Sequence, residues 1–522
     1  MFNGTSMSAP QATGAAALLL SAARAQGVAV TPLTLRRAVY GTAKPLPGEP
    51  TYVQGHGMVS VPDAWKQLRS GPQAREYTVD APVCTPLSGQ LTRPHRGAGL
   101  YNRCAPAAGG HHPGQSRDYT VTVTRTTGPA GDVPHTLTWK GNDGTFSAPA
   151  SVRLPLGTPT QVPVTAKPSA GVHSAILVVD DPATPLRDAE VSTVVTAPHR
   201  TLAAPDFRHE VAGTVQRNAV RSYLIDVPAG TATLELHLSK IATGSHTRFL
   251  AINPYGVPVE NVASTHCFTN HSDPALCAPI RRSYADPLPG LWEVTVESRR
   301  TSPVLDNPYA LVATALGVAV SPDPLTVPDA PAGTDVPVAW SLRNAFAPAT
   351  VTAKAAALGS VRRQRPTIAE GAAHRYTVDV PAGAQRFTAT IGGAADIGAD
   401  LDLKVERDGA VVGQSADGDA EESVTLTNPE PGRYTVVVDG YEVPTGTTAY
   451  DYLDAFYAPA LGMLRPAATT LELANGASAK LTGTLRAAGD PGEGRTLSGE
   501  LQLVTDVGTV VGRGSVVVGP PA

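Results

Sequence analysis

Most of this chain consists of short segments in which apolar and polar residues alternate, separated by clusters of turn residues. In residues 119–124, Tyr119, Val121 and Val123 alternate with threonines, and residues 234–238 repeat the pattern with three leucines. A period of two is typical of a strand with one buried face. The 522 residues include 50 Gly and 48 Pro without a collagen-like period, which favours many turns over long helices. Residues 71–522 are therefore predicted to form several all-β antiparallel sandwich domains.

Sustained helical patterning is confined to residues 1–68. A first helix is predicted from Ser8 to Gln26, because Gly27 is the residue type that most readily takes the left-handed conformation after a helix. Thr31 as N-cap and Pro32 at the first helical position predict a second helix over residues 33–40. A short strand and a third helix over residues 62–68 are expected to follow.

Composition and charge exclude several classes of protein. The formal net charge is −4 and the basic residues are scattered, so we expect no nucleic-acid partner. No run of about 20 apolar residues is present, so no membrane span is expected. The apolar run 14–20 resembles the hydrophobic core of a signal peptide, but no basic segment precedes it. Its position within the first predicted helix accounts for these apolar residues better.

The four cysteines fall into two local pairs, Cys84 with Cys104 and Cys267 with Cys277. Each pair lies in a segment rich in turn residues, so we predict two short-range disulfides and an extracellular, secreted protein, with free thiols as the alternative. The spacings lack the CxxC doublets of zinc sites, and no metal ligand is assigned.

An internal repeat links two distant parts of the chain. Residues 223–230 (YLIDVPAG) match 376–383 (YTVDVPAG), and residues 289–296 (PGLWEVTV) match 431–438 (PGRYTVVV). Because both matches keep their order, two copies of one sandwich module are predicted. The copies resemble the pre-peptidase C-terminal modules that follow the catalytic domains of secreted bacterial peptidases.

The strongest chemical signal is the octapeptide NGTSMSAP at residues 3–10, directly before a helix rich in small residues. A serine hydroxyl acts as a nucleophile only beside a base, with hydrogen-bond donors aimed at the oxyanion that forms. At a helix start, the N–H of Ser6 can donate to that oxyanion and the helix dipole favours its charge. Gly4 leaves room for a substrate backbone, and Asn3 and Thr5 complete the candidate site. The alternative is a first-turn serine without chemistry.

This octapeptide resembles the nucleophile motif of the subtilase (S8) family of serine peptidases, and the likeness continues through QGHGMVSV at residues 54–61. The pattern is most similar to bacterial tripeptidyl peptidase II-like subtilases. The resemblance implies that residues 1–70 are a truncated α/β subtilase end, with helices packing on a mostly missing parallel sheet. In the family the catalytic Asp and His precede the serine. Only five residues precede Ser6, so we expect a fragment of a longer precursor that is inactive alone, with Met1 an internal methionine.

Other candidate residues receive non-catalytic interpretations. His56 lies in what the resemblance implies is a structural turn, and His111 and His112 are expected to be solvated in a Gly/Pro loop. No cofactor is predicted with certainty, but calcium stays open as an alternative to solvated turn carboxylates at an acidic cluster. The cluster comprises Asp396, Asp400, Asp402, Asp417 and Asp419.

The predicted domains combine these signals. They are the subtilase end at 1–70, a fibronectin III-like sandwich at 71–200, pre-peptidase C-terminal-like copies at 201–318 and 359–455, and strands at 319–358 that could share a sandwich with the carboxyl-terminal strands 456–522. Two functions follow: a serine peptidase that cleaves protein or peptide substrates through an acyl-enzyme on Ser6, or a non-catalytic secreted binding or assembly protein with an inert subtilase remnant. The endopeptidase and tripeptidyl specificities, and the oligomeric state, stay open.

Overall fold

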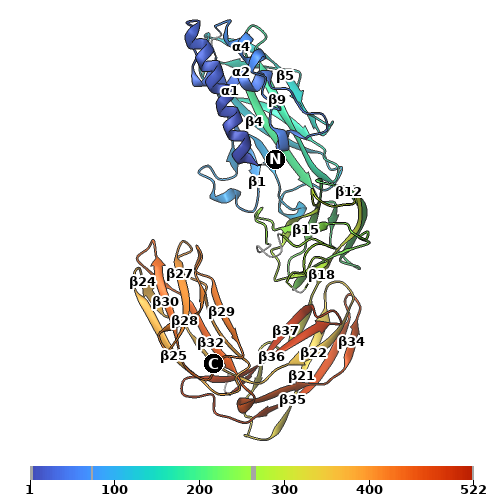
Figure 1. Cartoon of the computed structure of the whole chain (residues 1–522), viewed down its shortest axis with the longest axis vertical. Helices are drawn as coiled ribbons and strands as arrows, with labels where there is room; N and C mark the ends of the chain where they lie inside the picture. Colours follow the sequence, from blue (N-terminus) through green and yellow to red (C-terminus); the bar gives the residue numbers. More distant parts are fainter. Residues whose placement is uncertain (1–3, 72–73, 260–265, 275, 520–522) are drawn as a thin grey trace.

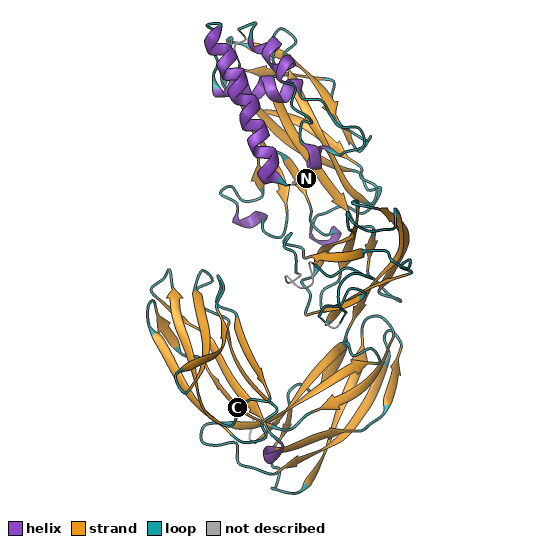
Figure 2. Ribbon diagram, in the orientation of Figure 1, coloured by secondary structure: helices purple, strands orange, loops and turns teal. Residues whose placement is uncertain are grey.

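The computed structural model describes residues 4–71, 74–259, 266–274 and 276–519. A helical segment and a first β-sandwich lie at one end, and further sandwiches follow along an arc (Figures 1 and 2). The predicted fold class, a short helical amino-terminal part followed by several antiparallel β domains, is confirmed.

The amino-terminal segment contains four helices. They are α1 Thr5–Ala25, α2 Pro32–Thr42, α3 Thr51–Gln54 and α4 Val61–Leu68. Helix α1 begins three residues earlier than predicted because Gly4 occupies the N-cap position. The start of α2 is confirmed: the Thr31 hydroxyl accepts from the backbone N–H of Thr34 at 3.1 Å in a capping box.

The prediction of a short strand before the last helix was wrong. Among the described residues of this segment, the pairing is limited to an isolated bridge between Lys44 and Met58. Gly57 has φ +107°, and a Cβ there would lie 2.3 Å from the Lys44 carbonyl oxygen. The close crossing of the two backbones therefore requires glycine, and it replaces a regular strand.

The first sandwich follows the helices directly. Its strands are β1 Tyr77–Cys84, β2 Arg96–Gly97, β3 Leu100–Asn102, β4 Arg117–Arg125, β5 Asp132–Lys140, β6 Phe146–Ser147, β7 Ser151–Pro155, β8 Thr160–Ala166, β9 Gly171–Asp180 and β10 Ala189–Ala197, with short 3-10 helices η1 Ser88–Gln90 and η2 Pro106–Ala108. Strand β1 pairs with β4 through its first half and with β3 through its second half, so it passes from one layer to the other. Val121 and Val123 are fully buried between the layers, as the alternation predicted.

The helical segment packs against this sandwich. Leu186, in the loop between β9 and β10, completes a small apolar cluster with the helical residues Leu19, Ala38, Ala64 and Leu68. Polar contacts add to the docking: the Thr51 hydroxyl donates to the Ser174 hydroxyl at 2.8 Å, and Arg37 lies 3.6 Å from Asp188. The helices thus bury their apolar residues partly against a β domain.

The second sandwich contains the first copy of the repeat. Its strands are β11 Arg200–Thr201, β12 Arg208–Gln216, β13 Val220–Val227, β14 Thr233–Ser239, β15 Thr247–Ile252, β16 Arg281–Ala285, β17 Gly290–Ser298 and β18 Asp306–Leu316. They form two four-stranded sheets, β11-β13-β17-β15 and β12-β18-β14-β16. The three leucines of residues 234–238 are fully buried between these sheets, as their alternation predicted.

The two repeated segments pair with each other in the second copy as they do in the first. Its strands are β24 Thr367–Ala369, β25 Ala373–Val380, β26 Arg386–Gly392, β27 Asp400–Arg407, β28 Ala410–Ser415, β29 Glu422–Thr427, β30 Gly432–Glu442, β31 Thr447–Ala449 and β32 Asp451–Tyr457. Val227 faces Gly290 in the first copy, and the equivalent Val380 faces Gly432 in the second. The pairing register of the two repeated segments is therefore identical.

A matching aromatic contact accompanies this register. The Trp292 indole N–H donates to the Leu288 carbonyl at 2.8 Å, and the equivalent Tyr434 hydroxyl donates to the Glu430 carbonyl at 2.8 Å. In both copies a buried aromatic ring thus satisfies its polar atom with the carbonyl four residues earlier.

The remaining strands come from two separate stretches of chain. They are β19 Val318–Ser321, β20 Leu325–Val327, β21 Asp335–Asn344, β22 Ala349–Ala355 and β23 Gly359–Gln364 before the second repeat, and β33 Gly462–Pro466, β34 Thr470–Leu473, β35 Ser478–Ala487, β36 Thr496–Thr505 and β37 Val510–Val518 after it, with η3 Pro459–Leu461. Strand β21 pairs with β35 along most of its length. Strand β23 pairs with β32, and Gln364 faces Tyr452, so the second repeat leaves and re-enters at neighbouring positions.

Side chains also join successive sandwiches. Arg103 of the first lies 3.1 Å from Glu293 of the second, and the Thr509 hydroxyl donates to Glu235 at 2.6 Å at the next junction. The two predicted disulfides are confirmed, with Cα separations of 5.5 Å for Cys84–Cys104 and 5.9 Å for Cys267–Cys277.

Candidate functional site

Ser6 occupies the first turn of α1. The N-cap Gly4 has φ +138° and ψ 169°, and its carbonyl accepts from the backbone N–H of Met7 at 2.9 Å. Because the first N–H groups of a helix have no intrahelical partner, the backbone at Thr5 and Ser6 presents donors at the positive end of the helix dipole. Asn3 of the predicted site lies outside the described residues.

The surroundings of Ser6 are open. Gly4, Thr5 and Ser6 are exposed, and in the whole of α1 the buried residues are Leu19 and Ala23. Large apolar side chains on the same helix remain accessible, with Leu18 64% and Leu20 47% exposed. A helix with so much apolar exposed surface is typical of one that packs against a further layer of protein.

No base adjoins the candidate nucleophile in the part of the chain that the structure describes. The Ser6 hydroxyl makes no hydrogen bond there with a histidine, whereas a Ser–His pair requires an oxygen–nitrogen distance of about 2.6–3.2 Å. The neighbouring Ser8 hydroxyl is turned back to the Gly4 carbonyl at 3.4 Å. The predicted site residues that the structure describes are thus brought together at the helix start, but no triad forms there.

His56 has partners of its own. Its Nδ1 lies 3.5 Å from Glu190, and its ring stacks on Tyr40 with centroids 4.3 Å apart. Its backbone carbonyl accepts from Lys140 at 2.8 Å. These contacts tie the turn at residues 55–57 to the first sandwich, which is what a structural role for His56 predicts.

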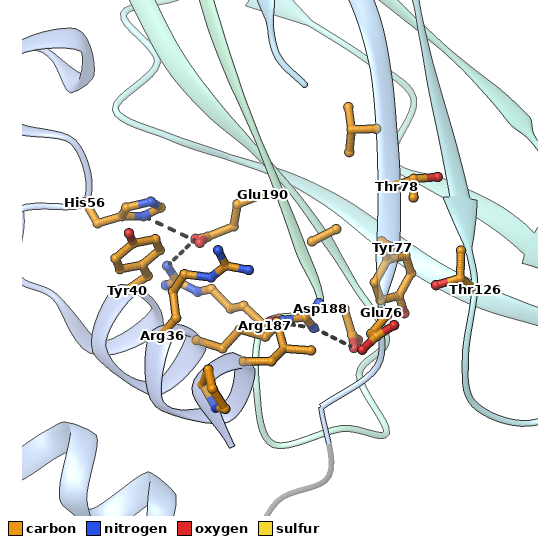
Figure 3. Close-up of a pocket in the computed structure, with 15 residues that line it drawn as sticks. Arg36, Tyr40, His56, Glu76, Tyr77, Thr78, Thr126, Arg187, Asp188 and Glu190 are labelled. Atoms are coloured by element: carbon orange, nitrogen blue, oxygen red, sulfur yellow. Dashed lines mark hydrogen bonds and ion pairs between the residues drawn. The ribbon is translucent and has the colours of Figure 1, made fainter. Parts of the chain in front are cut away.

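A cleft of about 710 Å³ lies at this junction between α2 and strands β1 and β10. Figure 3 shows His56 and Tyr40 on its helical side and Glu190, Asp188 and Arg187 on its sandwich side. Sequence reasoning missed this cleft because its residues come from segments more than 100 positions apart. Ser6 is not one of its lining residues.

Burial and neighbouring charges both act on the ionisable groups of the cleft. Burial is the largest influence and by itself raises the pKa of Glu190, but His56, Arg187 and Lys140 together outweigh it and lower that pKa. The pKa of Glu190 therefore lies below its usual value. Burial raises the pKa of the Tyr77 hydroxyl, and the charge of Asp188 adds to the effect.

The paired histidines of the Gly/Pro loop behave differently from each other. His112 is exposed as predicted, but the prediction for His111 was wrong, because this ring is fully buried. The His111 Nε2 lies 2.6 Å from the Tyr119 hydroxyl, and burial lowers the pKa of the ring. His111 is therefore a hydrogen-bonded core residue.

The acidic cluster is only partly assembled. Ligand atoms of Asp417, Asp419 and Glu422 lie within 4.8 Å of one another, and Glu422 was not among the predicted residues. Asp417 accepts from the backbone N–H of Asp419 at 3.3 Å, which is a turn contact. Asp396 is held elsewhere by Thr445, whose hydroxyl donates at 2.8 Å. Turn formation accounts for these carboxylates, and calcium stays an open alternative.

Comparison with protein families identifies three parts of the chain. Residues 1–57 match the subtilase family, residues 78–197 match the Ig-like domain in actinomycete serine proteases, and residues 372–440 match the bacterial pre-peptidase C-terminal domain. The second match overlaps the region for which a fibronectin III-like sandwich was predicted. The third falls within the second copy of the repeat.

Relatives extend the similarity over most of the chain. Pyrolysin of Pyrococcus furiosus is 23% identical over 485 residues, which is 85% of this chain and 31% of pyrolysin. Tripeptidyl-peptidase 2 of Arabidopsis thaliana is 36% identical over 126 residues, covering 24% of this chain and 8% of the plant protein. The chain therefore spans less than a third of the length of either relative.

The crystal structure of tripeptidyl peptidase 2 has a similar fold. It superposes on this chain with a TM-score of 0.58 and 15% identity, covering 100% of this chain and 47% of the other.

Among the described residues, no helix is both long enough and apolar enough to cross a membrane.

Proposed function

We propose that Ser6 of this chain, whose residues 1–57 belong to the subtilase family, is the nucleophile of a serine peptidase site. The substrate is a protein or peptide, and the reaction passes through an acyl-enzyme on the Ser6 oxygen. The single observation that supports it is the exposed hydroxyl of Ser6 in the first turn of α1, within the matched segment.

The chemistry follows from this position. A base removes the Ser6 proton as the oxygen attacks the scissile carbonyl carbon, and negative charge develops on the carbonyl oxygen. The Ser6 N–H and the positive end of the α1 dipole stabilise that charge. Gly4, with no side chain and nothing within 4 Å of a would-be Cβ, leaves space for the substrate backbone. In the sequence, Thr5 directly precedes the nucleophile and Asn3 lies three positions before it.

The base and its orienting carboxylate are proposed to come from a segment that a longer form of the protein supplies. In subtilases these residues precede the serine. The exposed apolar face of α1, with Leu18 and Leu20, gives such a segment a surface to cover. The finer proposal is a tripeptidyl peptidase II-like specificity, because tripeptidyl-peptidase 2 is among the relatives.

An extracellular location is proposed with this function. Two disulfides are typical of secreted proteins, and the pre-peptidase C-terminal match is described for bacterial proteins. The second candidate, a non-catalytic secreted binding or assembly protein, is favoured by the absence of a base beside Ser6 among the described residues.

A fluorophosphonate probe separates the two candidates. The 522-residue chain should show no labelling of Ser6, whereas a longer form that includes the upstream Asp and His segments should be labelled there. Ser6→Ala should abolish this labelling and peptide hydrolysis, a loss of ~10⁶-fold in kcat for a complete triad. Ser8→Ala, in the same helical turn, is the matched control and should retain both. A longer form that still hydrolyses peptides after Ser6→Ala would overturn the proposal.

A further inference from the structure

A hydrogen-bonded Ser–His–Asp constellation lies in the first sandwich, in a different domain from Ser6. The Ser169 hydroxyl lies 3.1 Å from Nε2 of His173, and Nδ1 of the same ring lies 2.6 Å from an Asp143 carboxylate oxygen. Both distances are within the range that a nucleophile, a base and an orienting carboxylate require.

Two loops and the start of one strand bring these residues together. Ser169 lies in the link between β8 and β9, His173 is the third residue of β9, and Asp143 lies in the loop between β5 and β6. The loops are fixed independently of the constellation. The Lys167 N–H donates to the Thr145 carbonyl at 2.9 Å, and the Gly114 N–H donates to the Pro168 carbonyl at 2.6 Å.

The carboxylate determines which nitrogen of the ring carries the proton. An ionised Asp143 only accepts hydrogen bonds, so Nδ1 of His173 must be the donor and, in the neutral ring, Nε2 keeps its lone pair. Thr145 supports the ionised form: burial raises the pKa of Asp143, but hydrogen bonds from Thr145 and His173 outweigh it and lower that pKa. Nε2 is therefore free to accept the proton of the Ser169 hydroxyl.

A backbone carbonyl and the open position of the serine complete the surroundings of the base. The Ser169 carbonyl lies 3.1 Å from Nε2 and accepts from it once the nitrogen is protonated. The His173 side chain is only 11% exposed, whereas Ser169 is exposed and can meet a reactant. Within the described part of the chain, the N–H groups of Ser169 and Ala170 have no acceptor, so both are available to an oxyanion.

We propose that Ser169, His173 and Asp143 form a second nucleophilic site that reacts with small carboxylic esters. The Ser169 oxygen bonds to the ester carbonyl carbon while its proton passes to Nε2 of His173. The carbon–alkoxide bond then breaks, and Nε2 returns the proton to the departing alcohol. Water repeats the sequence on the acylated serine, releases the acid and restores the site. Small esters are the substrate class because Ser169 lies on an open surface.

The experiment uses the full chain carrying Ser6→Ala, so that the outcome does not depend on the peptidase proposal. A fluorophosphonate probe and p-nitrophenyl acetate serve as reactants, and peptide mass spectrometry locates the modified serine. Ser169 should be labelled, and either Ser169→Ala or His173→Gln should lower the ester hydrolysis rate by ~10²-fold or more. Ser151→Ala, an exposed serine on β7 of the same sandwich, is the matched control and should change neither result.

Asp143 acts as a positioning residue and needs a separate readout. Asp143→Asn should move the His173 proton from Nδ1 toward Nε2, visible in the ¹⁵N shifts of the ring, and lower the ester rate. The disulfide Cys84–Cys104 and circular dichroism report that the sandwich stays folded. Absence of label at Ser169, or labelling that persists unchanged in His173→Gln, would overturn the proposal.

Discussion

Leu186 offers the sharpest test of how the helical segment is held. Its side chain is 2% exposed and lies in the loop between β9 and β10, yet its apolar neighbours are the helical residues Leu19, Ala38, Ala64 and Leu68. Truncating a buried leucine to alanine removes transfer free energy and leaves a cavity, which together cost about 3 kcal/mol. We therefore expect Leu186→Ala to weaken the docking of the helices by this amount.

Hydrogen exchange measures this effect locally. Because each 1.4 kcal/mol corresponds to a factor of ten, exchange protection in α2 and α4 should fall by ~10²-fold in Leu186→Ala. Peptides from β4, in the sandwich core, should keep their protection. Leu156→Ala is the matched control, since Leu156 belongs to the same sandwich but is 39% exposed. Unchanged protection in α2 and α4 would show that the helices are held without Leu186 and would refute the packing argument.

Three further predictions concern other contacts. The pKa of Glu190 is lowered, so this residue stabilises the fold at pH values above its usual pKa of 4.5, and the stabilisation is lost as the pH falls through the lowered pKa. The thermal unfolding temperature should therefore fall below about pH 4.5, and this pH-dependent part of the fall should be absent in Glu190→Gln. Replacing Cys84 and Cys104 by alanine should lower the unfolding free energy by ~3 kcal/mol in denaturant titrations. Removing the Cys267–Cys277 disulfide should lower it by ~0.6 kcal/mol less, because this disulfide closes a loop of 10 residues rather than 20. Equal losses would contradict loop entropy as the cause. Arg495→Leu removes the ion-pair partner that lies 2.5 Å from the fully buried Asp454, and it should lower the unfolding free energy by about 3 kcal/mol. The double variant Arg495→Leu/Asp454→Asn should recover most of this loss in the same denaturant titration.

Local patterns predicted the strands and helices well. The alternation around Val121 and Leu236 identified buried strand faces because side chains on a strand point alternately to its two sides. The capping pair at Thr31 and Pro32 located the start of α2 for an equally local reason. The motif around Ser6 led to the subtilase family, which the match of residues 1–57 supports.

Contacts between distant segments could not be predicted in the same way. Leu186 lies in a loop with no periodicity, so nothing in its neighbourhood indicates that it packs under the helices. His111 is buried because Tyr119 reaches it, although the surrounding Gly and Pro residues suggested solvent. Asp143 is 30 positions from His173, and only the sandwich fold brings them together. The spacing of Ser169 and His173 by four residues is too common a signal to identify the pair.

The way in which the second repeat is inserted has a mechanical consequence. Strands β23 and β32 run antiparallel, with Gly359 facing Tyr457 at one end and Gln364 facing Tyr452 at the other. The chain between Gln364 and Tyr452 leaves this strand pair at one end, whereas the rest of the chain is attached at the other end, at Gly359 and Tyr457. A pulling force on the chain ends therefore acts first on the Gly359–Tyr457 pair and must separate the two strands one residue pair at a time. Until the last pair opens, the backbone between Gln364 and Tyr452 carries no tension. That part of the repeat is therefore shielded from stretching by the pairing of β23 with β32.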